Sequence, residues 1–351
     1  MSAPISPLER LLAGRELTGS EIDRLVGRLT DPAATDAERA GLLVAWRAKG
    51  ETIEEIARFA RALRARAIPF PGPARARAVD LCGSGGAPRP SFNVGTVSAF
   101  VVRAAGVPVA KHGNRSARGA EGGWAGSSDL LEALELPFAR SRAFARAAFD
   151  RERITFLHAP LFHPATRAVV PVRRTLGVRT IFNLIGPLTN PAAVSIQIVG
   201  CPDVASAERI APVLARLGVR GGMTVASSDG LDEISARAPS ASFVVRSGTV
   251  RRRRLDPTRW LAPGERSGSL APLPPRDAAR ATERILAGGS GARRGSVLLT
   301  SAAALWVRGD ARSFAEGVAL ARAAVDTGAA GEVLARLREL ARARDWPEDA
   351  P

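Results

Sequence analysis

Residues 111–116 place a cation, an imidazole, a glycine, an amide and a hydroxyl side by side in the order Lys-His-Gly-Asn-Arg-Ser. The apolar residues before them, 106–110, predict a buried strand, so we expect the polar cluster on the loop at the carboxyl end of that strand. In open α/β sheets this edge is where ligands bind. The chain has only two lysines, Lys49 and Lys111, among 50 basic residues. A lysine in this cluster therefore indicates a specific role.

A glycine-rich turn, 83–86, follows a predicted strand at 78–82, and residues 91–96 open a predicted helix. Glycines let backbone amides approach an anion, and the helix dipole adds positive potential, so phosphate or pyrophosphate fits this turn. The turn matches neither the nucleotide P-loop nor the dinucleotide fingerprint. A plain tight turn stays open as the alternative.

Two further segments carry charges suited to a substrate and to a metal. Arg173 could grip a carboxylate with its two-pronged guanidinium. Asp232 and Glu233 are adjacent on a predicted loop and could hold Mg2+, which takes one or two carboxylates together with substrate phosphates. Each has a plainer alternative, because Arg173 could lie on a solvated helix face and the acidic pair in a solvated turn.

The first 70 residues predict helices at 5–12, 18–29, 35–49 and 52–67, from apolar residues at three-to-four spacing. Thr18 and Thr52 are each followed three residues later by glutamate, which is the capping-box pattern. Prolines and a glycine at 69–73 break any helix and mark a boundary. We expect a small all-helical domain over residues 1–72.

Beyond residue 72 the pattern changes, because predicted strands alternate with predicted helices. Strands are expected at 78–82, 107–110, 154–158, 194–199, 223–227 and 242–245, with helices such as 94–105, 129–134 and 204–217 between them. Such alternation is typical of a mostly parallel central sheet covered by helices. We expect a larger α/β domain over residues 73–351, with an irregular loop at 263–276 and solvated cover helices at 313–327 and 330–344.

Composition limits the classes of protein to consider. Hydrophobic content of 46% and charged content of 24% are ordinary for a globular protein. No apolar run approaches the roughly 20 residues of a membrane helix, and the N-terminus lacks the pattern of a signal peptide. Cys82 and Cys201 are too few for a disulfide framework. We therefore expect a cytoplasmic protein.

The net charge of +16 raises the possibility of nucleic-acid binding. Arginines are spread along the chain, however, and the one dense run, 251–254, lacks the aromatic residues on which single-stranded bases would stack. A composition rich in alanine, arginine, glycine and proline is the plainer explanation. A basic surface also suits a phosphorylated substrate.

Together, these motifs resemble the anthranilate phosphoribosyltransferase family, which has the nucleoside-phosphorylase-like fold. The clearest matches are Lys-His-Gly-Asn-Arg at 111–115, Val-Arg-Arg-Thr-Leu-Gly at 172–177 and Gly-Leu-Asp-Glu at 230–233. Others lie at 83–87, 91–96, 163–165 and 179–191, so the resemblance covers nearly the whole chain. It implies transfer of phosphoribose from phosphoribosyl pyrophosphate to the amine of anthranilate in tryptophan biosynthesis, with pyrophosphate released.

The resemblance also implies a role for each matching residue. Binding of the donor phosphates would fall to Gly83, Ser84, Gly85, Gly86, Asn93, Thr96 and Lys111. The acceptor would be bound by His112, Asn114 and Arg173, with Arg173 pairing with its carboxylate, and Mg2+ by Asp232 and Glu233. Helices from 165–190 would complete the helical domain, which would face the α/β domain across a cleft and form a homodimer.

Three departures from the family pattern fall on the donor side. Ala87 stands where the family has aspartate, Gly95 stands where it has serine, and the segment 117–126 is longer than its counterpart. They leave a second hypothesis open. In it the chain is a divergent member that acts on another aromatic amine, or a non-catalytic one that binds nucleic acid through its basic surface.

Overall fold

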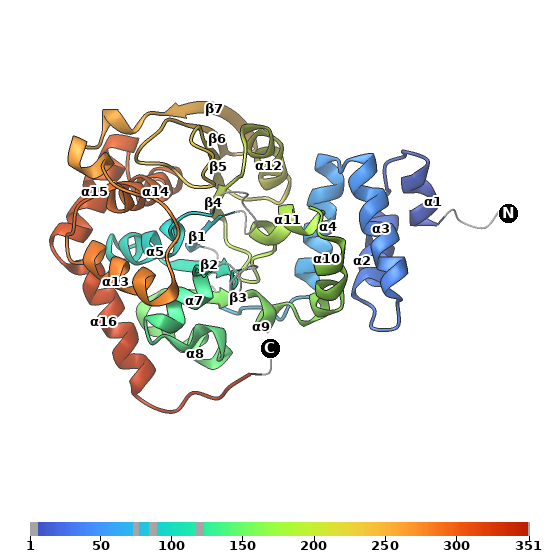
Figure 1. The fold of residues 1–351 in the computed structure, drawn as a ribbon, viewed down its shortest axis with the longest axis horizontal. Helices are drawn as coiled ribbons and strands as arrows, with labels where there is room; N and C mark the ends of the chain where they lie inside the picture. Colours follow the sequence, from blue (N-terminus) through green and yellow to red (C-terminus); the bar gives the residue numbers. More distant parts are fainter. Residues whose placement is uncertain (1–5, 73–76, 84–89, 117–122, 350–351) are drawn as a thin grey trace.

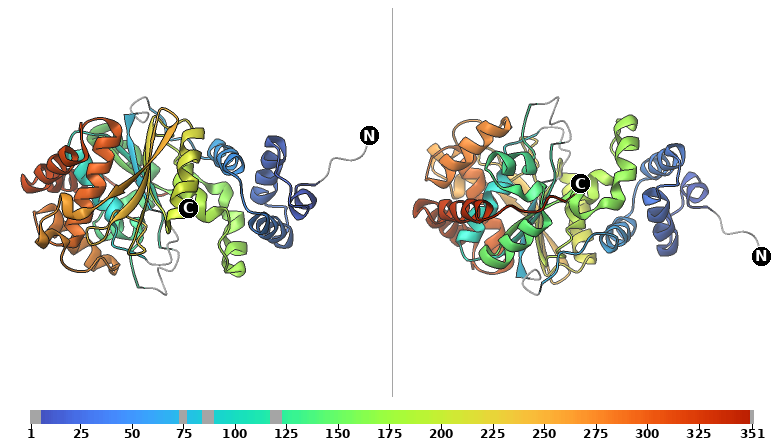
Figure 2. Two further views of the ribbon diagram at one scale, coloured as in Figure 1. Left: turned by 90° about the horizontal axis from the view of Figure 1, so that it is seen from above. Right: turned by 90° about the horizontal axis from the view of Figure 1, so that it is seen from below.

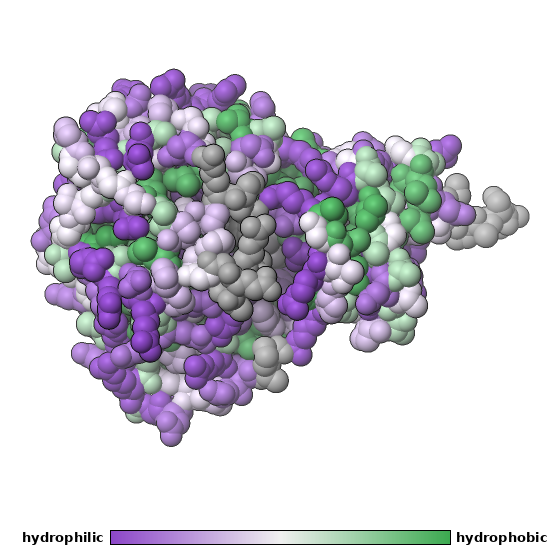
Figure 3. Space-filling view, viewed as in Figure 1, coloured by the Kyte–Doolittle hydropathy of each residue, from purple (hydrophilic) through white to green (hydrophobic). Residues whose placement is uncertain are grey.

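The computed structural model describes residues 6–72, 77–83, 90–116 and 123–349. A small group of helices lies at one end of the molecule and a larger α/β body at the other (Figure 1). Hydrophobic residues gather over the helical end on the face drawn in Figure 3. Within these ranges, no helix combines the length and apolar character needed to cross a membrane.

The helical end is built from the four helices expected at the start of the chain. They are α1 (Pro7–Leu12), α2 (Gly19–Thr30), α3 (Asp36–Lys49) and α4 (Ile53–Ala65). The capping boxes at Thr18 and Thr52 are both present, which confirms the predicted helix starts. Glu55 lies buried among these helices and accepts hydrogen bonds from Leu17 N–H, the Trp46 indole, Lys49 Nζ and Thr52 N–H at 2.8 to 3.1 Å.

The described strands form one sheet in the order β3-β2-β1-β4-β5-β6-β7. Neighbours from β3 to β5 run parallel, and β6 and β7 are antiparallel to the strands before them. This confirms the expected α/β class with a mostly parallel sheet. The strands are β1 (Val79–Cys82), β2 (Val109–Gly113), β3 (Ile154–His158), β4 (Ile196–Gly200), β5 (Gly221–Ser227), β6 (Ser240–Arg246) and β7 (Thr249–Leu255).

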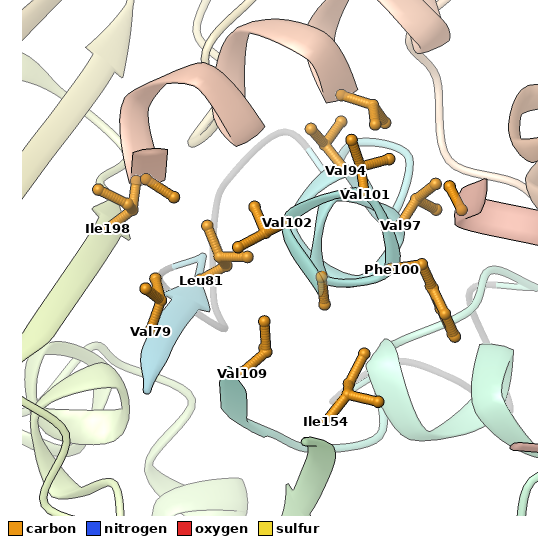
Figure 4. Close-up of a cluster of buried hydrophobic side chains, with 14 of the residues drawn as sticks. Val79, Leu81, Val94, Val97, Phe100, Val101, Val102, Val109, Ile154 and Ile198 are labelled. Carbon is orange, nitrogen blue, oxygen red and sulfur yellow. The ribbon is translucent and has the colours of Figure 1, made fainter. Parts of the chain in front are cut away.

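Helices cover both faces of the sheet, as the edge-on views of Figure 2 show. On one face α5 (Val94–Ala104) packs over β1 and β2, with Val97, Val101 and Phe100 fully buried in a common core (Figure 4). The opposite face is covered by α12 (Val204–Arg216), which also contacts α4 of the helical end. Strand alternation separates the two cores, because Ile198 belongs to one and Val199 to the other.

The remaining elements connect these layers. They are α7 (Ser127–Ala133), η2 (Pro137–Ala139), α8 (Arg142–Glu152), α9 (Ala159–Phe162), η3 (Pro164–Val169), α10 (Val170–Leu176), α11 (Phe182–Ile185), η4 (Gly186–Thr189), η5 (Pro257–Arg259), η6 (Pro263–Arg266), α13 (Pro275–Leu286), α14 (Ala292–Arg308), α15 (Phe314–Asp326) and α16 (Ala329–Arg342). Of these, η3 contacts α2 and α10 contacts α3.

Two sequence-based expectations are wrong. Lys111 and His112 lie inside β2 rather than on a loop after it, because β2 pairs with β3 as far as Gly113 and buries both side chains. The arginine run 251–254 forms most of β7, a strand that the sequence did not indicate. Its arginines are exposed on both faces of the sheet, so the sequence shows no apolar alternation there. Residues 251–254 form a strand because they pair with β6.

Replacing Glu55 with alanine should lower the free energy of unfolding by about 3 to 5 kcal/mol, because it leaves a buried Lys49 ammonium and other buried donors without a partner. Denaturant unfolding followed by circular dichroism measures the change. Glu54→Ala is the matched control, since Glu54 is exposed and pairs at the surface with Arg216. Equal losses for the two variants would contradict the role of Glu55.

Candidate active site

The carboxyl ends of β1 and β4 meet at the point where the strand order of the sheet reverses. The connections that follow the two strands leave this point in opposite directions, which opens a crevice at the carboxyl ends of the strands. Gly83 and Gly200 line it, and the loop carrying Asp232 comes close to both. A Cβ at Gly200 would overlap the carbonyl oxygen of Asp232, and one at Gly83 would lie 3.2 Å from its Oδ2. Glycine at both positions therefore permits the acidic loop to reach the strand ends.

Asp232 and Glu233 lie together in this crevice. Asp232 is buried, and Glu233 Oε1 accepts a hydrogen bond from the Gly95 N–H at 3.3 Å. Burial and the negative charge of Asp232 raise the pKa of the Glu233 carboxyl to about 8. Two adjacent buried carboxylates repel each other when both are ionised, and a bound cation would relieve this repulsion. Their oxygens are ligands that Mg2+ accepts.

Gly95 lies at the start of α5, beneath the acidic pair. A Cβ at this position would lie 2.8 Å from the carbonyl oxygen of Leu81 and 3.6 Å from Glu233 Oε1. Any larger residue would therefore require the helix to move away from β1. Glycine allows the backbone N–H of residue 95 to hold Glu233 directly.

Lys111, Ser127 and Thr96 form a hydrogen-bonded row next to this helix start. Lys111 Nζ donates to Ser127 Oγ at 3.1 Å, and Ser127 Oγ lies 2.9 Å from Thr96 Oγ1. The lysine is 3% exposed and forms no ion pair with a carboxylate of the described residues. A buried ammonium that forms no direct ion pair is costly, so this row suits an anion.

Asp80 lies below the row, at the centre of the sheet. It is fully buried and accepts hydrogen bonds from the His112 N–H at 3.1 Å and from Asn190 Nδ2 at 2.8 Å. Asn190 Nδ2 also donates to the carbonyl of Ala110 at 2.8 Å. Burial raises the pKa of the Asp80 carboxyl, and the charge of Lys111 opposes that rise. The carboxylate fixes β2 and the segment before β4 to β1.

His112 and His163 lie against each other on the side of β2 that faces η4. Their ring centroids are 5.2 Å apart, and His112 Nδ1 lies 3.1 Å from the carbonyl oxygen of Gly186. The Nε2 atoms of both rings are buried and have no hydrogen-bond partner among the described residues. Burial lowers the pKa of His163 to about 4 and that of His112 well below its usual value. Both imidazoles are therefore neutral at pH 7.

Arg173 lies on α10 and is half-buried. Its guanidinium carbon lies 5.2 Å from the centre of the Phe182 ring, and it forms no ion pair with an acid in the described ranges. Burial lowers the pKa of this guanidinium. A cation stacked on an aromatic ring and free of those carboxylates can bind an aromatic acid. Asn114 is exposed at the end of β2, where its Oδ1 accepts a hydrogen bond from the Arg115 N–H at 2.7 Å.

Comparison with known proteins agrees with this geometry. Residues 6–67 match the helical bundle domain of a glycosyl transferase family, and residues 75–331 match its a/b domain. The anthranilate phosphoribosyltransferase of Solibacter usitatus is 41% identical over 345 residues, which is 96% of this chain and 98% of that protein. The chain belongs to the anthranilate phosphoribosyltransferase family. The family prediction and the predicted fold class are thus confirmed.

Solved structures of anthranilate phosphoribosyltransferases have the same fold. The enzyme from Thermus thermophilus superimposes with a TM-score of 0.86 at 35% identity, covering 96% of this chain and all of that one. The enzyme from Saccharomyces cerevisiae, solved in complex with PRPP and Mg, superimposes with a TM-score of 0.83 at 23% identity. That alignment covers 97% of this chain and 98% of the yeast chain.

Some site residues implied by the resemblance to anthranilate phosphoribosyltransferases lie outside the described ranges. These are Ser84, Gly85 and Gly86, together with Ala87 and the first part of the longer segment, 117–122. Asn93 is described, and its Nδ2 donates to the carbonyl of Ala125 at 2.9 Å, which ties the start of α5 to the end of that segment.

Sequence reasoning missed three residues that the structure places in the candidate site. Asp80 could have been found as a lone acid inside an apolar strand, because such a charge is buried only with partners. His163 belongs to a matched family segment but was assigned no role. Ser127 carried no signal of its own, since a serine next to a second serine is common in a helix start.

The histidines give a prediction that depends on pH. The chain has only three, and the pKa values of His158 and His163 are lowered to about 4 from an ordinary value of 6.5. As the pH falls from 6.5 towards 4 the unfolded chain gains protons that the folded protein does not, so stability should decline, by about 3 kcal/mol per histidine. Ring resonances in NMR spectra should show no protonation near pH 6.5; titration there would contradict the burial argument.

Proposed function

We propose that this protein transfers phosphoribose from phosphoribosyl pyrophosphate to the amine of anthranilate and releases pyrophosphate, a step of tryptophan biosynthesis. The observation that carries this proposal is the meeting of an acidic pair and an anion-binding row at one crevice. Glu233 is held by the N–H of Gly95, and the next residue, Thr96, lies within hydrogen-bonding distance of Ser127 in the row that ends at Lys111. A metal-bound pyrophosphate requires both features close together.

On the donor side, Asp232 and Glu233 would hold Mg2+, and Gly83 together with Ser84, Gly85 and Gly86 would line the pyrophosphate. The residues fit the metal, because two adjacent acids in one crevice match its preference for a few carboxylates plus substrate phosphates. When bound, Mg2+ neutralises the charge that grows on the departing pyrophosphate. Asn93, Thr96 and Lys111 would hold the phosphate groups from the other side.

On the acceptor side, Arg173 would pair with the carboxylate of anthranilate while Phe182 supports the guanidinium. Its guanidinium carbon lies 5.2 Å from the centre of that ring, and the absence of an ion pair with the described acids leaves the two-pronged donor available. His112 and Asn114 would contact the acceptor nearby. Because His112 is neutral and its Nδ1 donates to the carbonyl of Gly186, its Nε2, which has no partner among the described residues, can accept a hydrogen bond without repelling the amine.

The reaction needs no side-chain nucleophile. Departure of pyrophosphate builds positive charge on the sugar and negative charge on the leaving group, and the row ending at Lys111 stabilises the latter. The amine is itself the nucleophile, so the protein has only to hold it in line with the anomeric carbon. Burial keeps water from the row, since Lys111 and Thr96 are 3% and 1% exposed.

The assay mixes the purified protein with phosphoribosyl pyrophosphate, Mg2+ and anthranilate and follows the loss of anthranilate fluorescence. Asp232→Asn with Glu233→Gln should reduce kcat/KM by about a hundredfold or more, because the isosteric amides lack the negative charge that binds the metal. The free energy of unfolding should not fall, since an ionised Glu233 is itself unfavourable in the fold. Asp277→Asn, an exposed acid on α13, is the control. Full activity in the double variant would exclude these acids from the site.

Arg173→Ala should raise the KM for anthranilate by about tenfold to a hundredfold, the usual cost of a lost charge-assisted hydrogen bond pair. The KM for phosphoribosyl pyrophosphate should change little, because only the acceptor has the carboxylate. Arg174→Ala, at the exposed neighbouring position, should leave both constants unchanged. If the two KM values of Arg173→Ala rise by equal factors, Arg173 does not bind the acceptor.

We further propose a cytoplasmic homodimer that pairs through the helical domain, residues 1–72 with helices from 165–190. Exposed apolar side chains support this surface, because Leu12 on α1 is 72% exposed and Val44 on α3 is 44% exposed, and α1 packs on α3. The helical end is also where hydrophobic residues gather in Figure 3. A monomeric mass in sedimentation at micromolar concentration would reject the dimer.

The alternative of a non-catalytic, nucleic-acid-binding protein has less support. Its main feature, the arginine run 251–254, lies on the outermost strand of the sheet, where charged residues discourage pairing with another strand. A divergent family member with an altered donor site that acts on another aromatic amine would still need the acceptor-binding residues described above. Absence of turnover together with tight, salt-sensitive binding to DNA or RNA would replace the proposed function with the alternative.

A further inference from the structure

Ser128 and His158 form a buried hydrogen bond beside the anion-binding row. Ser128 Oγ lies 2.8 Å from His158 Nδ1, and the two residues are 3% and 5% exposed. Ser128 follows Ser127 in the first turn of α7, and His158 is the last residue of β3. The bond therefore joins the helix that carries Ser127 to the edge strand of the sheet.

The same turn is tied to the chain after β2 by further hydrogen bonds. The Ser128 N–H donates to the carbonyl of Asn114 at 3.2 Å, and Asp129 Oδ2 accepts from the N–H groups of Ser116 and Gly126 at 3.0 and 2.9 Å. These contacts involve backbone groups of the chain after β2. The Ser128–His158 bond differs from them, because it joins side chains and connects the turn to β3.

Packing below the row leaves little room for the turn to move. A cavity of about 10 Å3 is lined by Lys111, Ser127, Ser128 and His158 together with Leu131 and Phe156. This is about the volume that one water molecule needs. Since closely packed interiors transmit displacements, a shift of Ser128 would move Ser127 relative to Lys111.

The choice of histidine at this position needs a reason beyond packing. Burial of an imidazole is unfavourable, and here it lowers the pKa of His158 to about 4, so the ring is neutral. An apolar residue such as those around it would fill the space at lower cost. The hydrogen bond to Ser128 is what a histidine adds.

We infer that the Ser128–His158 pair positions the donor phosphates of the proposed reaction, by holding Ser127 in place for its bonds to Lys111 and Thr96. Neither residue touches the substrate; both act through Ser127. The inference rests on the proposed function for the identity of the anion. According to this inference, the pair affects binding of the donor and not binding of the acceptor.

The test compares Ser128→Ala, His158→Leu and the double variant with the unaltered protein. The KM for phosphoribosyl pyrophosphate should rise about tenfold in each variant. The double variant should have a KM no higher than that of the more affected single variant, because each substitution removes the same Ser128–His158 hydrogen bond. The KM for anthranilate should stay within about twofold. His158→Asn, which keeps a polar atom near the position of Nδ1, should recover most of the loss.

Ser98→Ala is the matched control, because Ser98 is a buried serine of α5 whose hydroxyl donates to the carbonyl of Val297 at 3.2 Å. It should lower Tm as Ser128→Ala does and leave the donor KM unchanged. Equal increases of both KM values in Ser128→Ala, or a loss of stability with an unchanged donor KM, would overturn the inference.

Calorimetry with pyrophosphate and Mg2+ separates this inference from the proposed function, since it requires no acceptor and no turnover. Weaker pyrophosphate binding in Ser128→Ala than in the unaltered protein supports the positioning role even if anthranilate is not the acceptor. Equal pyrophosphate affinity in the two proteins overturns it, including in a protein that turns over anthranilate.

Discussion

The candidate site depends most on the hydrogen bonds made by the buried carboxylate of Asp80. It has no ion-pair partner among the described residues, so its charge is stabilised by the hydrogen bonds from His112 N–H and Asn190 and by the field of Lys111. These donors come from β2 and from the segment that precedes β4. One side chain thus determines how the strand bearing the candidate ligands sits relative to the strands that form the crevice.

The crevice also depends on glycines, which have no side chain to keep the backbone segments apart. Gly200 lets β4 approach the acidic loop so closely that a Cβ would overlap the carbonyl oxygen of Asp232, and Gly83 lies almost as near, 3.2 Å from the Asp232 side chain when a Cβ is added. Gly95 lets α5 approach the carbonyl oxygen of Leu81 on β1. Serine is the family residue at 95, so its absence suggested a weakened donor site. The structure gives a different physical account, in which the backbone N–H of Gly95 holds Glu233 where a side chain would push α5 away from Leu81.

The sequence predicted the helical end well, because capping boxes at Thr18 and Thr52 are local signals. It predicted the parallel sheet from alternation, yet missed β7, whose arginines follow no apolar period and pair only because β6 is beside them. It also placed Lys111 on a loop, since polarity ordinarily ends a strand; tertiary partners such as Ser127 reverse that preference. The hydrogen bond between Ser128 and His158 joins residues 30 positions apart, which no local pattern specifies.

Both lysines of this chain are buried, with Lys111 3% exposed and the Lys49 side chain 5% exposed. Its outer cationic charge is therefore carried by guanidinium groups, which stay protonated at any physiological pH. Reagents and enzymes that acylate primary amines meet no accessible lysine side chain on the folded protein. Acetylation of lysine, a common way to neutralise a cationic side chain, therefore cannot change the charge of this surface.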